Sequence, residues 1–162
     1  GTNGDDCPQV WGNSTEGQRG CRDLDGDGWP DTLDAYPNEI TQHRDSDGDG
    51  YGDNASGFQG DACPTAFGTS DEDRFGCLDS DRDGWSDAND DFPTDDDQYR
   101  DTDGDGYGDN AAAPNGDDCE DVFGNSTQGL RGCPDSDGDE WADSRDPFPN
   151  EGTQWADLDG DG

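Results

Sequence analysis

The chain has 162 residues, of which 44 are acidic and 8 are basic, and its formal net charge is −36. Only 24% of its residues are hydrophobic, so an ordinary apolar core cannot offset the loss of chain entropy on folding. The charge excludes DNA and RNA as partners, because their phosphates would meet like charge, and no apolar run is long enough for membrane insertion. Folding needs another source of free energy, and bound divalent cations would supply it by neutralising carboxylates.

The sequence repeats with a fixed period of 56 residues, which separates Cys7 from Cys63 and Cys63 from Cys119. A period of this length is typical of tandem arrays, in which each unit contacts its neighbours. We therefore expect the chain to self-associate or to continue end to end into a longer array. The register predicts three modules, 1–54 with a truncated start, 55–110 complete, and 111–162 with a truncated end.

Each module opens with two cysteines at the same separation, and we call the segment that they enclose the disulfide loop. An even number of cysteines in a short acidic chain indicates disulfides and an extracellular or cell-surface location. Zinc is disfavoured, because the chain has no Cys-x-x-Cys and His43 is its only histidine. The predicted pairs are Cys7 with Cys21, Cys63 with Cys77, and Cys119 with Cys133.

One aromatic residue followed by glycine recurs in each disulfide loop, as Trp11, Phe67 and Phe123. We expect these rings to form a hydrophobic plug packed against the disulfide, because large aromatic side chains dominate the little apolar burial that is available. The alternative is an aromatic platform for a sugar or a protein partner.

Three triplets match the acceptor pattern for N-linked glycosylation, and two of them lie in disulfide loops. Such triplets arise often by chance in a chain rich in Asn and Ser, so the sequence leaves their occupancy open. The triplets are Asn13-Ser14-Thr15, Asn54-Ala55-Ser56 and Asn125-Ser126-Thr127.

The first aspartate loop, residues 23–34, carries Asp at positions 1, 3, 5, 9 and 12 and Gly28 at the turn position 6. This is the spacing of a 12-residue calcium loop, with Asp in place of the usual Glu at the end and the carbonyl of Trp29 as a further ligand. A hard cation takes six to eight oxygens, which alternate residues of a tight loop direct inward. The predicted ligands of the three first aspartate loops are Asp23, Asp25, Asp27, Trp29, Asp31 and Asp34; Asp79, Asp81, Asp83, Trp85, Asp87 and Asp90; and Asp135, Asp137, Asp139, Trp141, Asp143 and Asp146.

These loops carry more negative charge than one ion neutralises, since five carboxylates and one Ca²⁺ leave a net charge of −3. We therefore expect several calcium ions, about two or more per repeat. In the third module Glu140 replaces the turn glycine. A non-glycine residue at positive φ is strained, so we expect either a distorted site there or an additional ligand from Glu140.

An aromatic-proline corner follows each first aspartate loop, at Pro37, Pro93 and Pro149. Because proline arrives within three residues and no apolar run of period 3.6 follows, the flanking helices of an EF-hand are absent or at most one turn long. Acidic residues that recur just beyond the corner are candidates to give an oxygen to a neighbouring ion. They are Glu39, Asp95 and Glu151.

The second aspartate loop, residues 45–54 and again 101–110, has the same spacing but no acid at position 12. Its closing carboxylate must come from elsewhere. The candidates are Asp61 and Asp117, which lie at the same sequence distance from their loops and just before a cysteine. This arrangement would join each second loop to the following disulfide loop. The predicted ligands are Asp45, Asp47, Asp49, Tyr51, Asp53 and Asp61; Asp101, Asp103, Asp105, Tyr107, Asp109 and Asp117; and, in a further site at the end, Asp157, Asp159 and Asp161.

The order of these motifs, DxDGDGxxDxxD, Phe-Pro, DxDGDGYGDN and Cys-Pro, resembles that of thrombospondin type 3 repeats over essentially the whole chain. The resemblance implies an irregular fold with little regular secondary structure: an elongated tandem-repeat array with a calcium-filled interior and disulfide staples. It also implies that Asp23, Asp25 and Asp27, with their counterparts in the other loops, are calcium ligands. The longer, aromatic-bearing segment between the paired cysteines departs from the family's pattern.

Catalysis is not expected, because one histidine cannot serve three modules and no lysine is present for phosphate or Schiff-base chemistry. The sequence favours a non-catalytic extracellular calcium-binding structural protein, a calcium-rigidified segment of a surface fibre, filament or stalk. The alternative is a cell-adhesion or ligand-binding module of a larger surface or secreted protein. A binding module would carry a concentrated, non-repeating surface, which the sequence does not show.

Overall fold

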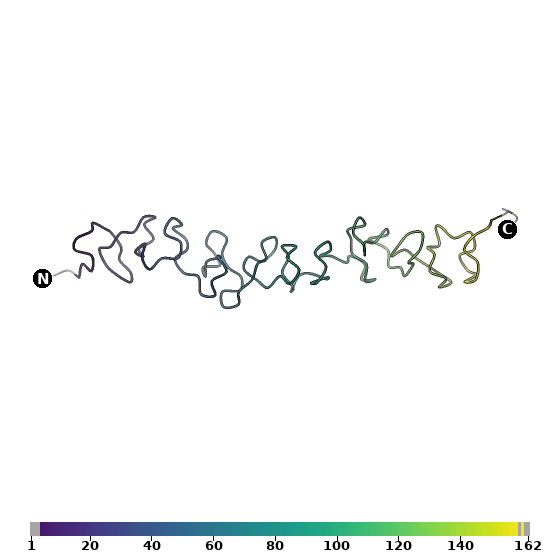
Figure 1. The fold of residues 1–162 in the computed structure, drawn as a ribbon, viewed down its shortest axis with the longest axis horizontal. Coiled ribbons are helices and arrows are strands. Elements are labelled where there is room, and N and C mark those ends of the chain that lie inside the picture. Colours follow the sequence, from purple (N-terminus) through teal and green to yellow (C-terminus); the bar gives the residue numbers. More distant parts are fainter. Residues whose placement is uncertain (1–3, 159, 161–162) are drawn as a thin grey trace. The chain divides into compact units, whose positions relative to one another are not determined.

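The computed structural model describes residues 4–158 and 160, and Figure 1 shows them as a succession of loops and turns. None of these described residues lies in a helix or a strand, so there are no element bounds to give. Among the described residues, β-type pairing occurs only at isolated bridges, which join Gly52 to Gly60, Gly108 to Gly116, and Gln128 to Trp141. The prediction of an irregular fold is confirmed. Its physical reason is that the sequence has neither the 3.6-residue nor the 2-residue apolar period that helices and strands require.

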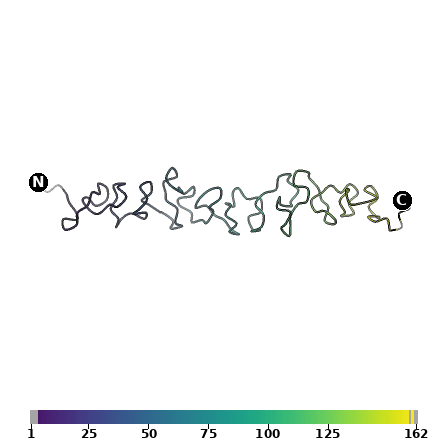
Figure 2. The same cartoon turned by 90° about the horizontal axis from the view of Figure 1, so that it is seen from above.

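The chain divides into two compact units, Gly1–Ala88 and Asn89–Gly162, and within each unit the loops follow one another in chain order (Figure 2). The boundary falls inside the loop 79–90, so the two sides of that loop are described with their own units. It does not coincide with the predicted module boundaries after residues 54 and 110. The three-module division therefore stays a prediction from the sequence register.

The interior is polar. Among the described residues the only buried hydrophobic side chains are those of three cysteines and Ala142, whereas the largest fully buried side chains are Gln42, Gln98 and Asp61. Apolar burial of this extent gives little hydrophobic stabilisation, at about 25 cal/mol per Å². Polar groups buried in place of an apolar core must be satisfied by hydrogen bonds or ions.

The three predicted disulfides are confirmed, with Cα–Cα distances of 5.0 Å for Cys7–Cys21 and 5.1 Å for each of the other two pairs. Closing a loop of this length stabilises the fold by roughly 3 kcal/mol in the chain-entropy model. A buried serine fills each loop. The hydroxyl oxygen of Ser14 accepts the amide hydrogen of Cys21 at 2.9 Å and donates to the carbonyl of Gln18 at 2.6 Å, and Ser70 and Ser126 do the same in the other loops.

The predicted aromatic plug is wrong, because Trp11, Phe67 and Phe123 are 89%, 59% and 65% exposed. The reason lies in the glycine that follows each ring. A Cβ atom added to Gly12 would lie 1.9 Å from the carbonyl oxygen of Cys21, so backbone packs directly on backbone there. Together with the buried serine, this contact fills the disulfide loop and leaves the ring outside.

Two buried glutamines, Gln42 and Gln98, organise the segment after each second aspartate loop. Each is 1% exposed. The Nε2 atom of Gln42 donates to the carbonyls of Asn54 at 2.9 Å and Phe58 at 3.2 Å, and its Oε1 atom accepts the amide hydrogen of Asn54 at 3.0 Å. Gln98 makes the same pair of bonds with Asn110, each at 3.0 Å. A side-chain amide therefore replaces the partner strand that would otherwise satisfy this backbone.

Replacing Gln98 with alanine is expected to destabilise this segment by about 2 kcal/mol, because the amide and carbonyl of Asn110 lose their buried partners. Hydrogen exchange at the Asn110 amide measures the effect as accelerated exchange. Gln154 keeps the same register but is exposed and bonds the carboxylate of Glu151, so Gln154→Ala is the matched control with little expected change. Equal protection in the two variants would contradict the assigned role of Gln98.

Candidate functional site

The first aspartate of each loop shapes the turn. In residues 23–34 the carboxylate of Asp23 accepts the amide hydrogens of Gly26 at 2.7 Å and Gly28 at 3.1 Å, which are positions 4 and 6. The same two bonds recur at Asp45, Asp79, Asp101 and Asp135. A carboxylate has about four lone-pair sites, so these bonds fix its orientation and leave acceptor capacity for a cation.

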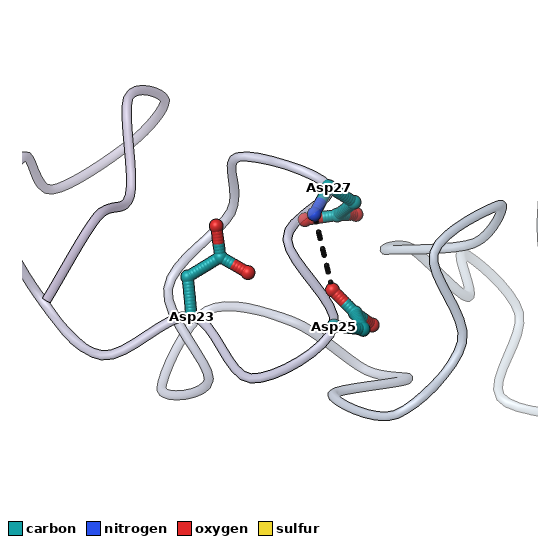
Figure 3. Close-up of side chains that lie close together, drawn as sticks. All are labelled: Asp23, Asp25 and Asp27. Carbon is teal, nitrogen blue, oxygen red and sulfur yellow. Dashed lines mark hydrogen bonds between the residues drawn. The ribbon is translucent and has the colours of Figure 1, made fainter.

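Carboxylate oxygens at positions 1, 3 and 5 then converge. In at least four loops among the described residues, one oxygen from each of these three aspartates lies within 4.8 Å of the others. Figure 3 shows Asp23, Asp25 and Asp27 around one turn, with the amide of Asp27 donating to Asp25 at 3.2 Å. The corresponding groups are Asp45, Asp47 and Asp49; Asp79, Asp81 and Asp83; and Asp101, Asp103 and Asp105.

The position-3 aspartate carries the oxygen atom that bears most directly on metal binding. One of its two carboxylate oxygens is buried and has no hydrogen-bond partner among the described residues, and this holds in all five loops. A buried charged oxygen without a partner costs several kcal/mol. The same atom is left without a partner in five loops, and a cation bound there could satisfy it. The residues are Asp25, Asp47, Asp81, Asp103 and Asp137.

The position-9 aspartate, by contrast, closes the loop. The carboxylate of Asp53 accepts both the amide and the hydroxyl of Ser46 at position 2, at 2.8 and 2.6 Å, and lies 3.3 Å from the Nε atom of Arg44. The same closure by a position-2 hydroxyl recurs at Asp87, Asp109 and Asp143. Asp31 accepts the amide of Leu24 and pairs with Arg22. The predicted role of position 9 as a ligand therefore competes with this closing contact.

The position-12 aspartate Asp34 lies close to the acidic group of its own loop. Burial raises the pKa of Asp34, the amide of Tyr36 lowers it, and repulsion by Asp27 and Asp25 raises it further. Its Oδ1 atom accepts that Tyr36 amide at 2.6 Å. Asp90 and Asp146 make the same bond two residues ahead, to Phe92 and Phe148.

Asp61 and Asp117 reproduce this position-12 geometry in the second loops. Asp61 is 1% exposed and its Oδ1 atom accepts the amide of Cys63 at 2.6 Å, while its Oδ2 atom is buried with no partner among the described residues. Asp117 is 2% exposed and bonds Cys119 at the same distance. The position-12 carboxylate is therefore present but lies five residues farther along the chain than in the first loops, and the buried glutamine holds the intervening segment.

The structure brings these closing carboxylates to their loops. Burial is the main cause that raises the pKa of Asp117 to about 6, and repulsion by Asp105 and Asp103 adds to it. Since this pKa lies above the ordinary value of 3.8, stability that is present below pH 3.8 is lost as the pH rises through about 6 in the metal-free chain. Burial and then repulsion by Asp49 likewise raise the pKa of Asp61. A cation in the loop would remove this repulsion.

Each second loop also contacts the following disulfide loop. A Cβ atom added to Gly76 would lie 2.4 Å from Oδ1 of Asp61 and 2.8 Å from Oδ2 of Asp49, so both carboxylates crowd this glycine. Oδ2 of Asp49 also accepts the amide of Gly68 at 3.2 Å, and Asp105 bonds Gly124 at 3.0 Å in the same way. The joining of each loop to the next disulfide loop, which the sequence predicted, is present in the geometry.

Glu140 has the strained backbone that the sequence predicted, with φ of 80° where Gly28 and Gly84 have 103° and 101°. Its carboxylate accepts the hydroxyl of Thr127 at 3.4 Å, so the side chain lies along the disulfide loop. Arg82 at position 4 is also strained, with φ of 72°, and the sequence reading missed it.

Glu140→Gly is expected to stabilise the calcium-loaded chain by about 1 kcal/mol, because glycine adopts positive φ without the steric cost that Glu pays. The midpoint of denaturant unfolding at saturating calcium measures the change. Gly84→Ala is the opposite control: its Cβ atom would lie 2.8 Å from Oδ1 of Asp71 at a φ of 101°, so it should destabilise. A shift of the same sign in both variants would contradict this explanation.

The remaining predicted residues lie at the edges of these groups. Glu39 accepts the hydroxyl of Thr41 at 2.7 Å, and Asp95 accepts Asn115 at 3.2 Å. The Oδ1 atom of Asp157 accepts the amide hydrogen of Gly160 at 2.7 Å. The position-1 aspartate of each described loop makes the same bond with the residue at position 4. Asp159 and Asp161 lie outside the described residues.

No family model matches the chain, and no curated protein matches it. Across the described residues there is also no helix of the length and apolar character that crossing a membrane requires.

Proposed function

We propose that this chain is a non-catalytic, extracellular calcium-binding structural protein, a tandem-repeat segment of a surface fibre, filament or stalk. The observation that supports it most is the buried, unpartnered oxygen at position 3 in five loops, exemplified by Asp25. Such an atom is costly in the metal-free chain and becomes a ligand when a cation binds. The thrombospondin type 3 resemblance supports the same assignment for the loops.

Calcium fits these groups better than other common ions. Ligand oxygens on one calcium ion lie at 2.3–2.6 Å, so opposite ligands are at most about 5 Å apart. The position-1, 3 and 5 oxygens lie within 4.8 Å of one another, close enough for one calcium ion to bind all three. Mg²⁺ requires a tighter octahedron and retains its water, and zinc prefers nitrogen and sulfur ligands.

The structural role follows from what calcium would replace. The chain has almost no buried apolar side chains and a net charge of −36, so ions that neutralise the loops would contribute the stability that an apolar core gives elsewhere. Three disulfides suit an oxidising, secreted setting. A period of 56 residues extends naturally by end-to-end continuation or self-association.

Ion counting by native mass spectrometry tests the metal assignment. At millimolar calcium we expect at least one ion for each of the five loops, with weaker uptake of magnesium. Asp103→Asn should remove one ion from the count, whereas Asp121→Asn, the same change at an exposed residue, should leave the count unchanged. A calcium-free spectrum under these conditions would refute calcium binding.

Electron microscopy of the native material separates the fibre from the alternative, a cell-adhesion or ligand-binding module. The exposed rings of Trp11, Phe67 and Phe123 are the observation that favours the alternative. Continuous filaments at millimolar calcium are the expected result. Discrete globular monomers would instead support the binding module.

A further inference from the structure

The exposed rings of the disulfide loops lie next to two acceptor asparagines. Trp11 is 89% exposed, although tryptophan is highly buried on average. Asn13 follows two residues later and is also exposed. Trp11 and Asn13 line one surface depression, together with Leu24. Phe123 and Asn125 have the same spacing in the third module, and both are exposed.

The three acceptor triplets differ in how free their asparagines are. The side chains of Asn13 and Asn125 are exposed and have no hydrogen bond to any described residue. Their neighbours Ser14 and Ser126 are buried. The amide of Asn54 is engaged: its Nδ2 atom donates to the carbonyl of Thr41 at 2.8 Å, and its oxygen accepts Ser56 at 3.2 Å. Two of the three triplets are thus compatible with a substituent in the folded chain.

We propose that Asn13 and Asn125 each carry an N-linked glycan whose first sugar packs on the ring of Trp11 or Phe123, and that Asn54 carries none. The donor is a lipid-linked oligosaccharide phosphate. The Nδ2 atom of asparagine bonds to the anomeric carbon of the sugar, the bond from that carbon to the phosphate oxygen breaks, and the lipid phosphate leaves as one Nδ2 proton passes to a base. The C–H face of the sugar then meets the electron-rich face of the ring.

Glycan transfer precedes docking of the aspartate loop. In the folded chain the backbone amide of Thr15 donates to the carbonyl of Gly28 at 2.8 Å, and the hydroxyl of Thr127 donates to Glu140. Both threonines belong to acceptor triplets, and a transferase must reach them in an extended segment. The modification is independent of calcium chemistry, so it goes beyond the proposed function and can hold or fail separately.

The second module provides a natural reference. It reads Phe67-Gly68-Thr69-Ser70-Asp71, which keeps the aromatic, the glycine and the buried serine but lacks both the acceptor Asn and the Thr two residues later. The expected glycan pattern is therefore one in the first module, none in the second and one in the third.

Glycopeptide mass spectrometry of the native protein tests the sites. We expect sugar mass on the peptides of Asn13 and Asn125 and unmodified Asn54; an unmodified Asn13 or Asn125 would overturn the proposal, and so would a sugar on Asn54. The double variant Thr69→Asn with Asp71→Thr, secreted from a glycosylating host, should gain a third glycan. If the variant gains no glycan, the aromatic-glycine pair does not determine which acceptor triplets are glycosylated.

Thermal unfolding of the glycoprotein tests the stacking. Trp11→Ala should lower Tm by about 2–4 °C in the glycosylated chain and much less in the Asn13→Gln background. Phe67→Ala is the matched control, because its module has no acceptor, and it should give the same Tm shift in both backgrounds. An equal effect of Trp11→Ala in both backgrounds would show that the ring does not contact the sugar.

Discussion

Excess chelator is expected to abolish the protease resistance of the calcium-loaded chain. Extracellular calcium sites bind with dissociation constants of about 10⁻⁴–10⁻³ M, so at millimolar calcium each site stabilises the folded state by roughly 1 kcal/mol. Five loops together contribute about 5 kcal/mol, which is comparable to the whole stability of many domains. Removing the ions also restores the repulsion among carboxylates that carry a net charge of −36.

Tryptophan emission reports the same loss of structure. Trp29, Trp85 and Trp141 occupy position 7 of the first aspartate loops, all are partly buried, and Trp29 stacks on His43 with ring centroids 4.8 Å apart. The chelator should shift their emission to longer wavelength as they become hydrated. Chelator presaturated with calcium is the control. Digestion at an unchanged rate in excess free chelator would show that the ions do not hold the fold.

Asp61→Asn is expected to have opposite effects with and without calcium. With calcium, the variant loses a charged closing ligand, so the affinity of the loop 45–53 should fall at least about tenfold. Without calcium, the variant should be the more stable chain. Burial and then repulsion by Asp49 raise the pKa of Asp61, so its negative charge opposes folding at neutral pH, and a neutral amide of the same shape removes that cost.

Two measurements on one protein establish this reversal: a calcium titration, and denaturant unfolding at zero and at saturating calcium. Asp121→Asn removes the same charge from an exposed side chain and should change neither measurement appreciably. Asp117→Asn should repeat the result in the second compact unit, because its burial and its bond to Cys119 match those of Asp61. Destabilisation of equal size in both conditions would mean that Asp61 acts by packing alone.

The features that the sequence predicted well depend on spacing. The disulfide pairs follow from the equal cysteine separations, and the absence of helices from the part of the chain that the structure describes follows from proline soon after each first loop. The constant offset of Asp61 and Asp117 to a cysteine marked them as related positions, and their role as metal ligands stays a prediction. In each case the number of residues between two positions limits how far apart they can lie in the fold.

The features that it missed depend on what fills the interior. The aromatic plug assumed that rings occupy the space beside a disulfide, whereas the hydroxyl of Ser14 and the backbone at Gly12 occupy it. The burial of Gln42 and Gln98 was not predicted, because a glutamine in the sequence does not by itself indicate a metal, catalytic or core role. Both residues nevertheless keep the 56-residue register. Closure at position 9 was readable from the serine or threonine at position 2 of four loops.

The hydrogen bond from the amide of Cys63 to Oδ1 of Asp61 connects a disulfide cysteine directly to the closing carboxylate of the second aspartate loop. Thermodynamic linkage then requires reciprocity: any loss of ion affinity on reducing Cys63–Cys77 equals the gain in reducibility on removing the ion. If the loop binds an ion, disulfide reduction and ion binding at this junction are therefore thermodynamically coupled. The same relation holds at Cys119, where Asp117 makes the equivalent bond.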